Sequence, residues 1–189
     1  MSEPIPSEAG REPAPEPLRT VQELINTRDL EAGTEELRTP DELAAWLRGH
    51  GLLTGPQALT AGDLERMLAV REALRALLDE RAHEGAVSAA TRDALRAGYG
   101  GAVLAPAFGE DGAPALVPAA EGLDGALARL HAIVAAAARE GTWSRLKVCG
   151  NAGCRWAFYD RSKNRSGSWC SMAVCGNRAK ARSFRSRNR

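Results

Sequence analysis

Four cysteines lie between positions 149 and 175, and the rest of the 189-residue chain has none. Four residues separate Cys149 from Cys154, and four separate Cys170 from Cys175. Four thiolates suit tetrahedral coordination of zinc in a closed structural site, with no position left for a substrate. A tight cluster also favours a metal site in a reducing compartment over disulfides. We therefore predict one structural Zn²⁺ per chain; four reduced cysteines buried in a core are the main alternative.

Positive charge is concentrated around and after these cysteines. Residues 1–140 hold 13 Lys and Arg against 23 Asp and Glu, a net charge of −10, whereas residues 141–189 hold 12 against 1, a net charge of +11. This asymmetry is typical of a chain in which one segment has a polyanionic partner.

The basic tail begins directly after Cys175. If a helix continues from there, four arginines share one face, while Lys180 and Arg187 lie to either side. The four are Arg178, Arg182, Arg185 and Arg189. A basic face of this kind can track phosphates, so we predict that the tail binds nucleic acid. A disordered basic extension that only aids solubility is the alternative.

Other candidate contacts to nucleic acid lie between and beside the cysteine pairs. Arg161, Lys163 and Arg165 belong to a polar loop, which either contacts phosphates or is simply solvated. Asn177 either hydrogen-bonds the backbone and sulfur atoms of the metal turn or contacts a base. The aromatic residues of this segment either pack around the metal or stack on bases: Trp156, Phe158 and Trp169.

The elements expected around the cysteines are short. Gly150 and Gly153 are expected to supply positive φ angles in the first turn. A strand is predicted over 156–159, where large and small residues alternate, and a helix is predicted to start near Cys170. The order of turn, strand, loop and helix is treble-clef-like. A unit under 50 residues has little core, so metal binding would supply much of its stability.

The rest of the chain has helical periodicity. Residues 1–17, rich in Pro, Glu and Ser, are expected to be a disordered leader. Helices are then predicted around Val21 to Ile25, from Thr39 with a capping box, after Thr60, from Ser88 and after Glu121. Gly109-Glu-Asp-Gly112, between two apolar runs, predicts a β-hairpin. No stretch approaches 18 apolar residues, so we expect no membrane span.

The expected fold class is therefore mainly α. A helical N-terminal domain with one small β-hairpin, residues 18–142, precedes a small treble-clef-like zinc finger with four cysteine ligands and a C-terminal basic helix, residues 143–189. We call these parts the body and the finger.

The motifs of the finger resemble the CGNR zinc finger family. The resemblance covers about residues 145–187 and rests on Cys149-Gly-Asn, the Trp-Ala-Phe-Tyr-Asp strand and Cys175-Gly-Asn-Arg178. The stretch Asn26-Thr-Arg-Asp-Leu-Glu31, with the helices after it, resembles the ABATE domain that usually precedes that finger. The resemblance implies zinc at the four cysteines, DNA as the partner, and a role in bacterial stress-induced transcription regulation.

The body lacks the patterns expected of an enzyme, because no Ser/His/Asp order, phosphate loop or paired carboxylates stand out. It could sense a small-molecule effector, form a homodimer or contact polymerase, and we favour the sensor. Asn26, Thr27 and Arg28 are candidate pocket residues; helix capping by Asn26 and Thr27 is the alternative. No signal peptide is recognisable, so we expect a cytoplasmic, nucleoid-associated protein.

The sequence thus predicts a bacterial DNA-binding transcriptional regulator, not an enzyme. Its zinc finger would bind DNA, and its helical body would sense a ligand or mediate assembly. An RNA-binding or protein-interaction adaptor, in which the zinc module is purely structural, is the second hypothesis.

Overall fold

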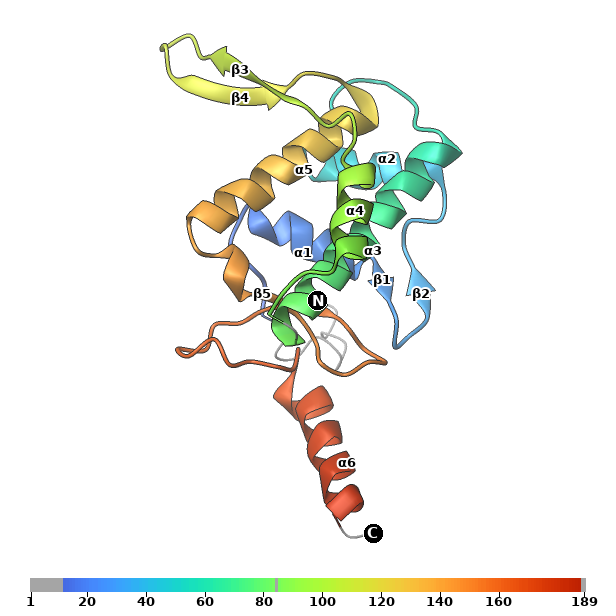
Figure 1. The fold of residues 1–189 in the computed structure, drawn as a ribbon. Coiled ribbons are helices and arrows are strands. Elements are labelled where there is room, and N and C mark those ends of the chain that lie inside the picture. The colour runs from blue at the N-terminus through green and yellow to red at the C-terminus, as the bar shows by residue number, and fades with distance from the viewer. Residues whose placement is uncertain (1–11, 84, 188–189) are drawn as a thin grey trace, which may run out of the picture.

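The computed structural model describes residues 12–83 and 85–187, and it is mainly helical (Figure 1). The fold class predicted from the sequence is confirmed. The described part of the body has five α-helices: α1 (Leu18–Asn26), α2 (Pro40–Gly49), α3 (Ala61–His83), α4 (Ala89–Gly98) and α5 (Gly122–Arg139). None of the described helices is long and apolar enough to cross a membrane.

Within the described ranges, three antiparallel ladders accompany these helices. The predicted hairpin is β3 (Leu104–Phe108) paired with β4 (Pro114–Pro118). The body holds a second, two-residue ladder between β1 (Arg28–Asp29) and β2 (Thr34–Glu35), which is too short to leave a periodic pattern in the sequence. The finger contributes the third ladder, in which β5 (Leu146–Val148) pairs with β6 (Ala157–Tyr159).

Local capping explains where two of the helices begin. The Thr39 hydroxyl accepts a hydrogen bond from the Glu42 amide at 3.2 Å, and the Glu42 carboxylate accepts one from the Thr39 amide at 3.1 Å. This is the predicted capping box, and it satisfies two amide groups that the first turn leaves free. Ser88 caps α4 in the same way by accepting from the Thr91 amide.

The prediction of a disordered leader is wrong over residues 12–17. Ala14 is buried, and its amide donates to Gln22 Oε1 at 2.6 Å. The Glu12 carbonyl accepts from the Tyr159 amide at 3.2 Å, so this segment lies between α1 and β6. These long-range contacts offset the chain entropy that composition alone suggested would win. Residues 1–11, which the same prediction covered, lie outside the described residues.

The hydrophobic core crosses the boundary between the body and the finger. Leu24, Leu78 and Leu127 from α1, α3 and α5 are fully buried at its centre. Leu146 and Tyr159 of the β5–β6 ladder belong to the same cluster, and β5 packs on α3. The first hairpin of the finger is therefore part of the body's core.

The two ends of the molecule carry the elements that leave this core. The β3–β4 hairpin extends from one end (Figure 1). At the other end the chain passes through a short 3₁₀ turn, η1 (Trp143–Arg145), the cysteine loops and a π-helical turn, η2 (Met172–Gly176). It then enters α6 (Asn177–Arg187), which projects away from the other helices (Figure 1).

Candidate metal centre

The four cysteine sulfur atoms converge on one point. All four lie within 4.8 Å of one another, and all four residues are buried. Cys154 Sγ lies 3.7 Å from Cys170 Sγ, which lies 3.9 Å from Cys175 Sγ. Tetrahedral zinc with Zn–S bonds of about 2.3 Å requires sulfur atoms about 3.8 Å apart. These separations fit a tetrahedral metal ion and are far longer than a disulfide of about 2.05 Å.

The first ligand pair is held by backbone hydrogen bonds. The Cys149 amide donates to the Trp156 carbonyl at 2.9 Å, and the Cys154 amide donates to the Asn151 carbonyl at 2.8 Å. Gly150 and Gly153 do not have the expected positive φ; Arg155, directly after the second ligand, has φ of 47° instead. The turn over 152–154 lies between the two cysteines, and the left-handed backbone angle falls on Arg155 at its end.

The second pair spans the π-helical turn η2. The wider turn holds Cys170 and Cys175 around one point, and the Gly176 amide donates to the Ser171 carbonyl at 3.0 Å. Asn151 Nδ2 lies 3.7 Å from Cys175 Sγ, so the first turn donates to a ligand of the second. The aromatic residues predicted to pack around the site do so: Trp156, Phe158 and Trp169.

The crowding of the thiols shows why the site favours a cation. A hydrogen bond from Cys154, and then one from Cys170, lowers the pKa of Cys149. The same hydrogen bond to Cys149 raises the pKa of Cys154, because its proton is shared with an ionised neighbour. Four ionised sulfurs in this space repel one another, and a bound divalent cation removes that repulsion.

The finger is fastened to the body through β6. Asn26 Nδ2 donates to the Ala157 carbonyl at 2.9 Å, and Asn26 Oδ1 accepts from the Ala157 amide at 2.8 Å. On α3, Arg75 Nη1 donates to the Arg155 carbonyl at 2.8 Å, and Asp79 forms an ion pair with the Arg155 guanidinium at 2.9 Å. The start of β6 and the residue that precedes Trp156 are therefore fixed to two different helices.

Sequence reasoning missed the charged residues beneath this interface. Arg71 and Arg75 lie on the core face of α3 and are each about 1% exposed. Arg71 makes a bidentate pair with Glu35 at 2.7 Å, and both arginines contact Glu72. Helical periodicity predicts only the apolar stripe of α3. It does not reveal these two buried arginines, because arginine is ordinarily exposed.

The predicted basic face of the tail is only partly described. Arg178 forms an ion pair with Glu31 in the turn between β1 and β2, so it contacts the body. Arg185 is exposed on α6. The side chain of Arg182 and the whole of Arg189 lie outside the described residues.

The structure also places two other residues of the predicted tail. Lys180 is exposed, but about 200° separates it from Arg178 around an α-helix, so it lies on the opposite face rather than beside the arginines. Asn177 is exposed, and its Nδ2 donates to the Ala173 carbonyl at 3.1 Å.

The backbone of the loop after β6 is arranged around one buried carboxylate, that of Asp160. Asp160 accepts from Lys147 Nζ at 2.7 Å, from the Ser162 amide at 2.9 Å and from the Gly167 amide at 2.8 Å. Burial opposes its ionisation, but these hydrogen bonds outweigh burial and hold the pKa of Asp160 well below its usual range. The loop from 160 to 167 thus closes around an ionised aspartate.

Two of the three loop cations have protein partners. Arg161 pairs with Glu12 at 3.2 Å and donates to the Pro13 carbonyl, while Arg165 donates to Ser144 Oγ at 3.0 Å. Lys163 is exposed.

The three candidate pocket residues of the body lie in different environments. Asn26 lines a cavity between the body and the finger. Thr27 is buried, donates to the Leu24 carbonyl and accepts from Arg71, so it has a structural role. The side chain of Arg28 is exposed, and its carbonyl accepts from Arg75.

Comparison with known families agrees with this architecture. Residues 18–142 match the family described as ABATE, putative stress-induced transcription regulator. Residues 145–188 match the CGNR zinc finger. A search of curated proteins gives no match. The chain therefore belongs to the ABATE family of putative stress-induced transcription regulators, and its C-terminal segment is a CGNR zinc finger.

Proposed function

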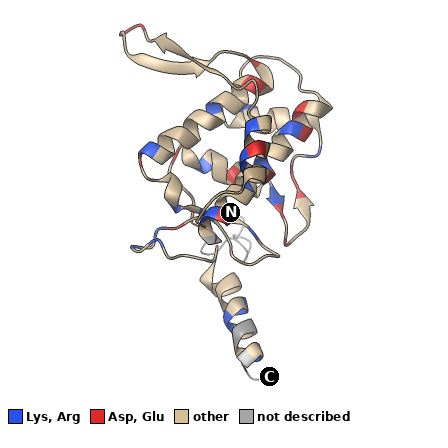
Figure 2. Cartoon of the chain, in the orientation of Figure 1, with Lys and Arg blue, Asp and Glu red and all other residues tan. Residues whose placement is uncertain are grey.

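We propose that the protein is a DNA-binding transcriptional regulator whose zinc-bound finger presents α6 to duplex DNA, while the body senses a ligand or mediates assembly. The projection of α6 away from the core carries this proposal (Figure 2). Asp160 is the last acidic residue of the sequence, so the side chains of α6 can only attract a polyanion. Binding to duplex DNA would place the protein on the nucleoid.

The dimensions of α6 suit a DNA groove. An 11-residue helix is about 16 Å long, and the major groove of B-DNA, about 12 Å wide, admits an α-helix. Basic residues lie on both sides of the helix, with Arg185 on one face and Lys180 on the other. Such a helix can contact the phosphates on both walls of a groove, which is the sequence-independent part of DNA affinity.

Zinc has a structural role in this proposal. Four thiolates complete the coordination shell, so the ion has no open position for chemistry. The ion would join the turn at Cys149 to η2, and η2 leads directly into α6. The metal would therefore fix the direction in which the basic helix leaves the body.

Fluorescence anisotropy with labelled 30-base-pair genomic duplexes and RNA of the same sequence tests the proposal. We expect tighter binding to the duplex, with an affinity that falls steeply as salt rises. The double variant Lys180→Ala, Arg185→Ala should reduce the slope of log K against log salt by about 2. The matched control Arg92→Ala, Arg96→Ala, on α4, should leave that slope unchanged.

An RNA affinity equal to the duplex affinity would support an RNA-binding adaptor in place of a transcription factor. An unchanged salt slope in the tail variant would remove α6 from the nucleic-acid interface.

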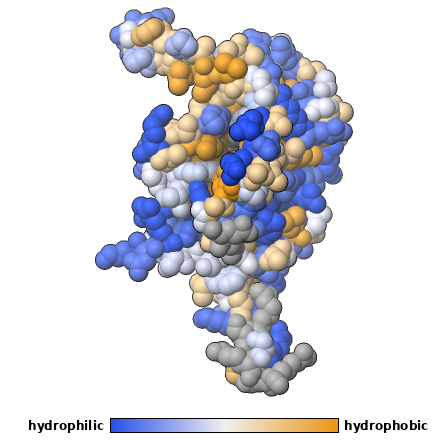
Figure 3. Space-filling view, in the orientation of Figure 1, coloured by the Kyte–Doolittle hydropathy of each residue, from blue (hydrophilic) through white to orange (hydrophobic). Residues whose placement is uncertain are grey.

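Assembly of the body through the β3–β4 hairpin is supported by its exposed apolar residues. Phe108 is 76% exposed and Leu116 is 62% exposed. Figure 3 shows apolar surface on the hairpin at this end of the molecule. The two residues line a groove of about 520 Å³ between the hairpin and α5.

We propose a second copy of the chain as the occupant of this groove, because two-fold dimers match DNA sites with paired half-sites. Light scattering should give a dimer, and Phe108→Ser should give a monomer; a monomeric wild type would contradict this role.

A further inference from the structure

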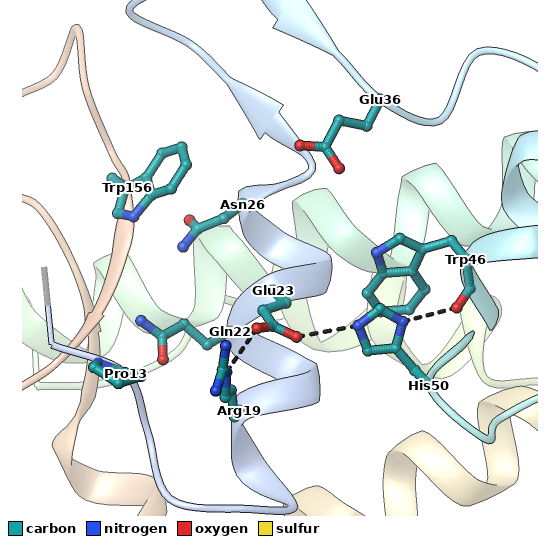
Figure 4. Close-up of a pocket in the computed structure, with 9 residues that line it drawn as sticks. All are labelled: Pro13, Arg19, Gln22, Glu23, Asn26, Glu36, Trp46, His50 and Trp156. Carbon is teal, nitrogen blue, oxygen red and sulfur yellow. Dashed lines mark hydrogen bonds and ion pairs between the residues drawn. The ribbon is translucent and has the colours of Figure 1, made fainter. Parts of the chain in front are cut away.

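A cavity of about 610 Å³ lies between α1, α2 and the finger (Figure 4). Two indole rings wall it, Trp46 from α2 and Trp156 from the segment between Cys154 and β6. His50 stacks on Trp46 with ring centroids 3.8 Å apart, which fixes that ring. The volume falls within the range of small-molecule sites in proteins.

The two carboxylates at this cavity, Glu23 and Glu36, differ in their cationic partners. Glu23 pairs with Arg19 at 2.7 Å and contacts His50 Nε2 at 3.1 Å. Glu36 turns toward the space between the two indoles, and none of the ion pairs among the described residues includes it (Figure 4). Burial, and then the charge of Glu35, raises the pKa of Glu36. Arg71 forms an ion pair with Glu35, the neighbour of Glu36 in the sequence.

We propose that this cavity binds an organic cation, an amine or quaternary ammonium with an apolar body, between Trp46, Trp156 and Glu36. Indole faces attract cations through their quadrupole, and a pair of such rings beside a carboxylate recognises alkylammonium groups. An anionic ligand would meet Glu23 and Glu36. A neutral ligand would gain nothing from the charge of Glu36, which is exposed but turned toward the cavity.

The position of the cavity connects it to the finger. Asn26 and Gln22 line it, and both donate to the carbonyl of Ala157. Trp156 precedes Ala157 and lies two residues after a metal ligand. A bound cation would therefore contact the residues that hold β6 and the first ligand pair in place. This consequence rests on the proposed DNA-binding function, whereas cation binding itself does not.

Nuclear magnetic resonance of the indole N–H groups tests binding on the full-length zinc-loaded protein without DNA. The probes are choline, tetraethylammonium and benzyltrimethylammonium, and 3,3-dimethylbutan-1-ol is the uncharged isostere of choline. We expect saturable shifts at Trp46 and Trp156, assigned with Trp→Phe variants, and no shift at Trp143. Glu36→Gln should weaken binding by about fivefold or more, whereas Glu110→Gln, in the β3–β4 turn, should leave it unchanged.

Three results would overturn the assignment. These are no saturable shift with any of the three cations, equal shifts with choline and its isostere, and an unchanged affinity in Glu36→Gln. An unperturbed Trp143 signal in Glu36→Gln shows that this variant is folded.

The coupling to the finger has a separate readout. With a saturating cation, the affinity for duplex DNA should change by about threefold or more in the wild type and not in Glu36→Gln. Binding of the cation without any change in DNA affinity would retain the site and remove its link to the finger. If the protein binds no DNA at all, the proposed function fails while the cation site still stands on the resonance data.

Discussion

Asn26 and Ala157, 131 residues apart, form a two-way hydrogen-bonded pair in which one side-chain amide satisfies both backbone groups. The Asn26 side chain bonds to the N–H and C=O of Ala157 as a neighbouring strand would. It therefore satisfies backbone groups at an edge of β6 that no strand of the described residues covers there. It makes α1 one of the two helices, with α3, that set the position of the finger.

Asn26→Ala should lower the free energy of unfolding by about 1–3 kcal/mol, because it removes the acceptor of the Ala157 N–H and one of the two side-chain donors to the Ala157 C=O, the other being Gln22. Urea unfolding measures the loss, and hydrogen exchange at the Ala157 amide should accelerate. Asn164→Ala, in the exposed loop, is the control and should change neither quantity. Unchanged exchange at Ala157 would show that the pair does not hold the strand.

Removal of metal should loosen the finger and leave the body folded. The wild type should hold about one zinc per chain, and Cys154→Ser should lose most of it, because three thiolates bind zinc more weakly than four. Metal analysis gives the stoichiometry, and near-ultraviolet circular dichroism reports Trp169 beside the site. The helical signal should persist, because the core centres on α1, α3 and α5.

Met172→Leu is the matched control for metal loss, since Met172 is exposed between the ligands. It should retain the zinc. Full zinc occupancy in Cys154→Ser would remove Cys154 from the ligand set.

The stability of the finger should depend on the ionisation of Asp160. Its pKa is depressed in the folded state, so its contribution is fully present above the unfolded value of about 3.9 and is lost as the pH falls toward the folded pKa. Asp160→Asn should therefore lower the free energy of unfolding by about 2 kcal/mol at pH 7. The difference from the wild type should shrink below about pH 4.

Urea unfolding at several pH values measures this difference. Asp93→Asn, at an exposed pair on α4, is the control and should show little effect at any pH. A gap between Asp160→Asn and the wild type that stays constant from about pH 7 to about pH 3 would contradict the role of the ionised carboxylate.

The ion pair between Arg178 and Glu31 should compete with DNA. Glu31→Gln frees Arg178 for phosphate, so duplex affinity should rise by about two- to fivefold, the range expected of an exposed pair. In a chain that also carries Arg178→Ala, Glu31→Gln should have no effect on affinity. Anisotropy at fixed salt measures both, with Glu65→Gln on α3 as the control for the lost negative charge. Equal affinities in Glu31→Gln and the control would show that the pair does not restrain α6.

The sequence by itself determined the four cysteines of the candidate metal centre, the five helices of the body with the β3–β4 hairpin, and the split in charge. Ligand type and spacing are local properties, and so are the capping box at Thr39 and the apolar stripes of the helices. Each depends on residues within a few turns of one another, so periodicity and residue chemistry reveal them.

Only the tertiary structure decided how the finger joins the body. The burial of Arg71 and Arg75, the pairing of Asn26 with Ala157 and the packing of residues 12–17 depend on contacts between segments far apart in the chain. Nothing in the local sequence distinguishes such an arginine from a solvated one, because its partners are backbone carbonyls and a glutamate brought near by folding. The cavity between the two tryptophans arises in the same way, from a helix and a metal turn that meet only in three dimensions.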